Sequence, residues 1–220
     1  MGLEWARQFA ASGWRVHASC RHPDGADALR QLTMQYPDVL VHRLDVTRPD
    51  EIAALARTAS VDALDILINN AGVYFEHWGR DPLGRIDYGD WESTLRVNTL
   101  GSVRVTEAVT DNLTRGKRRL VVTITSHMGS IADIEQPRDY AYRSSKAALN
   151  AAMKGISLEL QPRGIGVLLL HPGWVRTRMG GPDAPLSPQQ SVRGMRAVIE
   201  RYEPSMSGHF YRYDGAQLPW

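Results

Sequence analysis

The chain has 220 residues, of which 43% are hydrophobic and 23% charged, so it fits one globular α/β domain with a full hydrophobic core. Its net charge of +2 is too small to indicate a nucleic-acid partner, and its apolar runs are too short to span a membrane. A single cysteine, Cys20, excludes an intrachain disulfide, and the N-terminus shows no signal peptide, so we expect a cytoplasmic protein.

The first half of the chain alternates helix and strand. Residues 3–12 carry apolar side chains at helical spacing and end before Gly13, a residue typical of helix C-termini. Pro49 fits the first turn of a later helix. In chain order, the pattern predicts a helix at 3–12, a strand at 14–19, a helix at 27–35, a strand at 39–44, a helix at 49–58 and a strand at 64–69.

The second half continues the alternation with longer helices. In chain order, it predicts a helix at 90–113 that bends near Gly101, a strand at 120–125, a helix at 140–160, a strand at 166–170, a helix at 187–202 and a strand at 208–211. Strands separated by helices imply a parallel, doubly wound sheet with right-handed crossovers. No internal repeat or linker divides the chain, so we expect one domain over residues 1–220.

The strongest chemical signal is Tyr142 with Lys146, four residues apart and therefore on one face of a helix. A free tyrosine, with a pKa of about 10, is a poor acid or base at neutral pH, but a nearby cation lowers that pKa. Such a pair can give a proton to a carbonyl oxygen or take one from an alcohol. The same spacing also occurs by chance on helix surfaces. Only three of the 26 basic residues are lysines, which favours a specific role for Lys146.

Three further motifs lie at or just past the ends of predicted strands. They are Asn69-Asn70-Ala71-Gly72, Thr123-Ile124-Thr125-Ser126 and Pro172-Gly173-Trp174-Val175-Arg176-Thr177. Together with Tyr142 and Lys146, in this order, they resemble the short-chain dehydrogenase/reductase family over nearly the whole chain. Residues 126–131 and 213–220 are similar to its C-factor and sniffer-like carbonyl reductase branch. The resemblance implies a Rossmann-like fold and hydride transfer between NADPH and a small carbonyl or alcohol substrate.

The resemblance assigns four catalytic residues. Tyr142 is expected to act as the general acid/base, and Lys146 to bind the nicotinamide ribose and lower the tyrosine pKa. Ser126 is expected to hydrogen-bond the substrate carbonyl, although a strand-end cap is the alternative. Asn98 matches the helix asparagine that holds a proton-relay water, although it can instead bond local backbone.

The resemblance also places the cofactor. Asp45 and its neighbour Val46 match the residues that meet the adenine, although Asp45 can also cap the helix that starts at Pro49. The loop at 173–188 is a candidate lid or a plain surface loop. The remaining expected contacts are Gly2, Asn70, Ala71 and Gly72 toward the phosphates and adenosine, and Pro172, Gly173, Val175 and Thr177 toward the nicotinamide. No metal site is expected.

The residues after the first predicted strand indicate NADP rather than NAD. NAD-binding folds place an acidic residue there for the ribose hydroxyls. This chain has Ser19-Cys20-Arg21-His22 instead. Arg21 can pair with a 2′-phosphate, and a plain loop arginine is the alternative.

The N-terminus departs from the family pattern, which begins with a strand and Thr-Gly-x-x-x-Gly-x-Gly. Gly2 matches only the last of these glycines, so we expect a chain that lacks the first strand and most of the glycine-rich loop. A misassigned start, a natural truncation and engineering all explain such a chain. The alternative function is a non-catalytic or weakly cofactor-binding relative that acts in signalling or interaction. Helices near 98–113 and 140–160 resemble family dimer contacts, which implies a homodimer or homotetramer.

Overall fold

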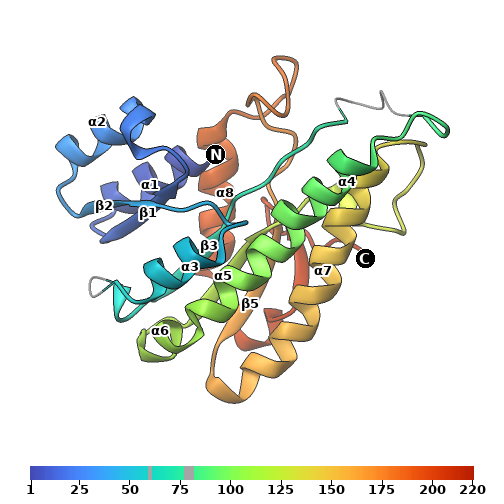
Figure 1. Ribbon diagram of the computed structural model, residues 1–220. Coiled ribbons are helices and arrows are strands. Elements are labelled where there is room, and N and C mark those ends of the chain that lie inside the picture. The colour runs from blue at the N-terminus through green and yellow to red at the C-terminus, as the bar shows by residue number, and fades with distance from the viewer. Residues whose placement is uncertain (59–60, 77–81) are drawn as a thin grey trace.

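The computed structural model describes residues 1–58, 61–76 and 82–220 (Figure 1). Its helices are α1 (Gly2–Ala11), α2 (Asp27–Gln35), α3 (Pro49–Ala56), α4 (Tyr88–Leu95), α5 (Ser102–Ala108), α6 (Thr110–Arg115), α7 (Tyr140–Leu160) and α8 (Pro188–Glu200). Its strands are β1 (Val16–Cys20), β2 (Val39–Arg43), β3 (Ile66–Asn69), β4 (Leu120–Ile124), β5 (Gly166–His171) and β6 (His209–Arg212). The shorter elements are the 3₁₀ turns η1 (Pro23–Gly25), η4 (His127–Gly129), η5 (Gln161–Arg163) and η6 (Pro204–Met206), and a π-helical turn, η3 (Arg96–Gly101).

The predicted order of helices and strands is confirmed, and the helical stretch expected at 90–113 with a bend near Gly101 is helical, with a π-helical turn that ends at Gly101. That stretch divides into α4, η3, α5 and α6. The π-helical turn ends at Gly101, and Val46 packs against its backbone there. A side chain at residue 101 would clash, because its Cβ would lie 2.6 Å from Val46 Cγ2. Farther along, Thr106 and Thr110 bond their hydroxyls to carbonyls four residues back, a pattern that often bends helices.

All strand pairs are parallel, as predicted, but they form two sheets rather than one. β1 pairs with β2, while the second sheet has the order β3-β4-β5-β6. Within the described ranges, no strand pairs with the second edge of β1 or of β3. The strand expected to be lacking would lie between these two edges in a doubly wound sheet. The structure therefore leaves that position open and does not close the gap by pairing β1 with β3.

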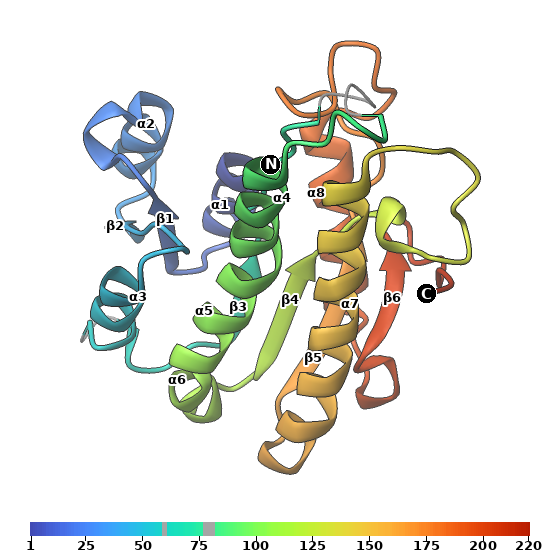
Figure 2. The same cartoon turned by 45° about the vertical axis from the view of Figure 1, so that its right-hand side comes forward.

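The larger sheet is covered by helices on both faces (Figure 2). Side chains alternate between the faces, as expected for strands with a period of two. Leu120, Val122 and Ile124 pack with residues of α1 and α8, whereas Val121 packs with Leu149 and other residues of α7. β4 is buried along its whole length, while β1 is only partly buried. The most completely buried strands are therefore β4 and β5, and the candidate site lies beyond their carboxyl ends.

Candidate active site

A cavity of about 620 Å³ opens beyond the carboxyl ends of β3, β4 and β5. Its wall comes from the segments that follow these strands, from the first turns of α7 and from the N-terminus of α1. Parallel strands bring their carboxyl ends to one edge, so motifs distant in sequence meet there. The predicted site residues that line this cavity are Gly2, Asn70, Gly72, Ser126, Tyr142, Lys146, Pro172, Gly173, Val175 and Thr177.

Tyr142 and Lys146 lie one helical turn apart on α7 and are both buried, with 8% and 4% of their surfaces exposed. The Lys146 ammonium donates a hydrogen bond to the Ile124 carbonyl at 3.0 Å, and it lies 5.8 Å from the centre of the Tyr142 ring. Gly72 lies beside this lysine, where a Cβ would make ordinary contact with Lys146 Nζ at 3.7 Å. The two side chains and the end of β4 therefore share one wall of the cavity.

The lowered pKa expected for Tyr142 is wrong for this structure. Burial raises the pKa of the Tyr142 phenol to about 12, and a hydrogen bond with Ser126 opposes this rise in part. Burial also lowers the pKa of the Lys146 ammonium to about 8. Taking both groups out of water disfavours their charged forms, and this burial is the main cause of both pKa shifts. At neutral pH the phenol is therefore protonated and the lysine still largely charged.

Ser126 ends the segment after β4 and begins η4. Its hydroxyl oxygen accepts a hydrogen bond from the Met128 N–H at 3.2 Å, so the capping role left open for it is present. The same residue lines the cavity and opposes the rise of the Tyr142 pKa. The cap therefore orients the hydroxyl beside the phenol, and the two roles coexist.

Asn98 is fully buried in η3 and does not line the cavity. Its Oδ1 accepts the Val73 N–H at 2.8 Å, and its Nδ2 donates to the Val73 carbonyl at 2.9 Å and to Ser145 Oγ at 3.0 Å. These partners lie 25 and 47 residues away along the chain, so the alternative of bonding to local backbone does not describe this side chain, and the proton-relay role stays a prediction. Asn98 thus fastens the segment after β3 to α7.

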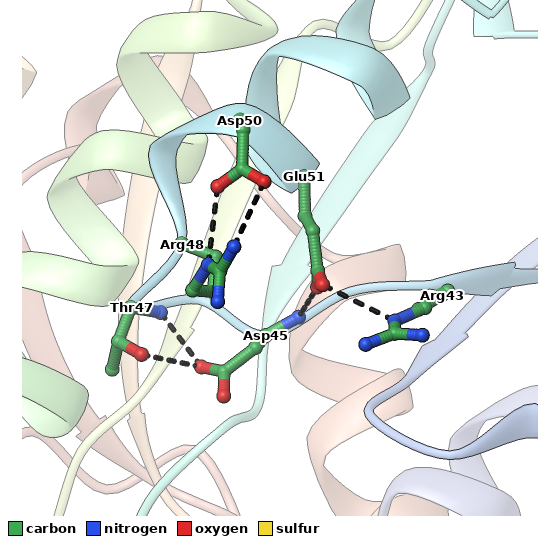
Figure 3. Close-up of polar contacts among 6 residues, drawn as sticks. All are labelled: Arg43, Asp45, Thr47, Arg48, Asp50 and Glu51. Carbon is green, nitrogen blue, oxygen red and sulfur yellow. Dashed lines mark hydrogen bonds and ion pairs between the residues drawn. The ribbon is translucent and has the colours of Figure 1, made fainter.

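The residues expected near the adenine lie away from the cavity. Asp45 follows β2 and accepts the Thr47 N–H at 2.9 Å and the Thr47 hydroxyl at 2.7 Å (Figure 3). Mainly because of the Thr47 N–H, its pKa is lowered, with a smaller contribution from the charge of Arg21. The N-cap of α3 is Arg48, so Asp45 holds the turn before that helix rather than capping it.

Two charged side chains hold the end of β2 next to Asp45. Glu51 Oε2 accepts the Asp45 N–H at 2.6 Å, and Glu51 Oε1 accepts from Arg43, which stiffens the end of β2 (Figure 3). Arg21 is exposed just after β1, and Ala71 is exposed after β3. Neither these two residues nor Asp45 and Val46 line the cavity.

The loop after β5 forms the outer wall of the cavity. Gly173 has a φ of +79°, and a Cβ there would run into Leu186, so glycine is required at this turn. Trp174 Nε1 donates to the Gly180 carbonyl at 2.7 Å. Met179 brings its sulfur to 3.9 Å from the Tyr142 hydroxyl. The loop therefore lines the cavity, and its role as a lid stays a prediction.

Several cavity residues were not singled out by the sequence motifs. His127 and His171 hold their rings 5.9 Å apart, and burial lowers the pKa of His171 to about 3. His127 directly follows Ser126, and His171 directly precedes Pro172, so their adjacency to motif residues was an available signal. Tyr74 and Met128 also line the wall.

The described residues carry neither a metal cluster nor a membrane-spanning helix. No group of three or more His, Cys, Asp and Glu residues in these ranges is arranged to hold a metal ion. Across 1–58, 61–76 and 82–220, no helix combines the length and apolarity that crossing a membrane requires.

Comparisons with known proteins agree with the motifs. Residues 1–185 match the family model of the short chain dehydrogenases. C-signal of Myxococcus xanthus is 47% identical over 167 residues, which cover 76% of this chain and 99% of C-signal.

Solved structures of similar fold include two carbonyl reductases. The carbonyl reductase Sniffer of D. melanogaster has a TM-score of 0.90 at 27% identity, covering 100% of this chain and 95% of that one. A carbonyl reductase from chicken fatty liver, solved with NADPH bound, has a TM-score of 0.92 at 29% identity, covering 100% and 94%. The resemblance to the carbonyl reductase branch is confirmed.

Proposed function

Because this chain belongs to the short-chain dehydrogenase family, we propose that it transfers a hydride between NADPH and a small carbonyl or alcohol substrate. The observation that carries the proposal is the meeting of Ser126, Tyr142 and Lys146 at one cavity wall. These residues come from two elements and serve no evident packing purpose as a group. A buried phenol beside a buried ammonium suits proton transfer to a carbonyl oxygen.

The residues at the cavity fit the nicotinamide end of the cofactor. Among the described residues, the Lys146 ammonium donates a single hydrogen bond, which leaves two of its three donors for ribose hydroxyls. Gly2 and Gly72 allow close backbone approach, and the N-terminus of α1 suits an anionic phosphate. Pro172, Gly173, Val175 and Thr177 would hold the ring, and Asn70 would line the adenosine side. When bound, NADPH supplies the hydride.

The chain's own residues would handle the proton. Ser126 donates a hydrogen bond to the carbonyl oxygen and stabilises the negative charge that develops there. Tyr142, protonated at neutral pH, gives its phenolic proton to that oxygen as the alcohol forms. The Lys146 ammonium then stabilises the phenolate until solvent returns a proton. With a pKa of about 12 the phenol keeps its proton at neutral pH, but it is a weaker acid than a free tyrosine, so this proton transfer depends on the ammonium stabilising the phenolate as it forms.

NADP is proposed over NAD because the end of β1 carries Arg21 and no carboxylate. Arg21 is exposed and acts electrostatically on Asp45, so it lies at the edge where a 2′-phosphate would reach the ends of β1 and β2. A guanidinium matches a phosphate in charge and geometry. We further propose a homodimer or homotetramer built on the outer faces of α5 and α7, and a cytoplasmic location.

A second candidate is a non-catalytic relative that acts in signalling or interaction. The split between the β1–β2 sheet and the larger sheet favours it, because that split lies where a phosphate-binding turn would be supported. Similarity to a protein named C-signal fits it as well. The catalytic set argues against it, since a binding protein needs no buried tyrosine–lysine pair.

Titration of the purified chain with NADPH, followed by a panel of small aldehydes and ketones, separates the two. Saturable NADPH binding with carbonyl-dependent NADPH oxidation is expected for the oxidoreductase. A chain that binds no NADPH at millimolar concentration and turns over no carbonyl would refute the first proposal and leave the second. Tyr142→Phe serves as the matched control for background oxidation.

A further inference from the structure

The catalytic helix α7 begins without a cap of its own. Its N-cap residue, Asp139, has a left-handed φ of 56°, and its side chain makes no capping hydrogen bond. The first N–H groups of a helix have no partner within the helix and need one from elsewhere. Tyr142 is in this first turn, so the cavity's phenol sits on the part of α7 most prone to fray.

Glu76, from the segment after β3, supplies the missing partner. Its Oε1 accepts the Ala141 N–H at 3.0 Å, and its Oε2 accepts the Tyr142 N–H at 2.7 Å. The carboxylate is buried, with 5% of the residue exposed. A carboxylate that accepts backbone N–H bonds at a helix N-terminus makes strong, charge-assisted bonds and also opposes the helix dipole favourably.

The rest of this segment is fixed to the same helix. Val73 is held by Asn98, and the Tyr74 hydroxyl donates to Asp139 Oδ1 at 2.6 Å. The Tyr74 ring also lies 4.8 Å from the ring of Tyr142. The segment after β3 is therefore bonded to η3 through Val73 and to the first turn of α7 through Tyr74 and Glu76.

We propose that Glu76 is a positioning residue for Tyr142: it fixes the first turn of α7 so that the phenol is held in the cavity. Glu76 does not line the cavity, and it acts on the phenol through the backbone N–H groups of Ala141 and Tyr142. A displacement of about 1 Å in an acid/base can cost about 10²-fold in rate. The catalytic part of this proposal rests on the proposed function, whereas the structural part does not.

The chain offers a matched control. Asp65 Oδ1 accepts the N–H groups of Lys117 and Arg118 at 2.6 and 3.0 Å, so it too is a carboxylate bonded to two successive amides. It lies where β3 and β4 begin, at the opposite end of the sheet from the cavity. Asp65→Ala removes the same kind of bond without touching α7.

The test compares Glu76→Ala, Glu76→Gln and Asp65→Ala in the full chain by amide hydrogen exchange and by steady-state carbonyl reduction. For Glu76→Ala we expect exchange at residues 141 and 142 to rise at least about 10-fold, the ratio for one lost hydrogen bond of about 1.4 kcal/mol. We expect kcat to fall about 10-fold or more, with KM changed less than about 3-fold. Glu76→Gln keeps an oxygen for the Tyr142 N–H and should recover part of both effects.

Asp65→Ala should leave kcat and the amide exchange of α7 equal to those of the unsubstituted chain, even if it lowers the melting temperature as much as Glu76→Ala does. The proposal is overturned if Glu76→Ala leaves exchange at residues 141 and 142 unchanged, or if its kcat falls no more than that of Asp65→Ala. A chain without any carbonyl reduction would refute the proposed function instead. In that case the exchange data alone decide whether Glu76 fixes the first turn.

Discussion

Extending the chain ahead of Met1 with a strand-forming segment and a Thr-Gly-x-x-x turn should stabilise it. β1 presents five residues and β3 four along edges that pair with no strand in the described part of the chain. A parallel strand between them would join the two sheets and bring a glycine-rich turn to the N-terminus of α1. Met1, Val16, Ile66 and Ile68 pack at the margin of the core there, so an added strand would find apolar neighbours.

The size of the effect follows from these edges. Roughly nine new backbone bonds at about 1 kcal/mol each are offset by ordering about six residues at about 1.5 kcal/mol each. The net gain in the free energy of unfolding then comes from burying two or three apolar side chains, which contributes about 5 kcal/mol in total. For a domain of this size that corresponds to a rise in Tm of about 10–20 °C. Backbone amides near the pyrophosphate should tighten NADPH binding about 10-fold or more.

A paired thermal melt and NADPH titration of the short and extended chains measures both effects. An extension of equal length rich in Gly and Ser is the control, because it cannot form a strand and should change neither value. If the strand-forming extension leaves Tm and affinity equal to those of the short chain, the bare edges of β1 and β3 carry no cost. The chain would then complete its site in another way, and the account of the open position would be wrong.

Four further predictions each concern a single residue. Tyr142→Phe should lower carbonyl reduction at least about 10²-fold with little change in Tm, and near-normal turnover would remove Tyr142 from the acid role; Lys146→Arg should also impair turnover, because a guanidinium cannot reproduce the ammonium's reach. Arg21→Ala should lower the preference for NADPH over NADH, measured as a ratio of dissociation constants, and an unchanged ratio would make Arg21 a plain loop residue. His171 has a folded-state pKa of about 3, below its usual 6.5, so the unfolded chain takes up a proton first and stability should fall by up to a few kcal/mol as the pH drops from about 6.5 toward 3. Melting curves of His171→Asn should show a smaller loss of folding stability between pH 6.5 and 3 than those of the unsubstituted chain. An equal loss in both chains would contradict this prediction.

Local sequence signals determined the elements and their order. The helices at 27–35 and 140–160 begin and end at the predicted residues, because helix periodicity and termini depend on near neighbours in the chain. The alternation of helix and strand was enough to predict parallel pairing. The resemblance to the short-chain dehydrogenase/reductase family implied that Ser126, Tyr142 and Lys146 meet, and all three line one cavity.

Contacts between distant segments decided the rest. Val46 packs against the π-helical turn at Gly101, and Glu76 bonds the first turn of α7, although neither residue is a neighbour in sequence of the turn it contacts. The pKa of Tyr142 rises rather than falls because its burial is a property of the whole cavity wall, which the spacing to Lys146 does not encode. The division into two sheets also required the structure, because the sequence predicts where strands form, whereas edge pairing depends on which strands the fold brings within hydrogen-bonding distance.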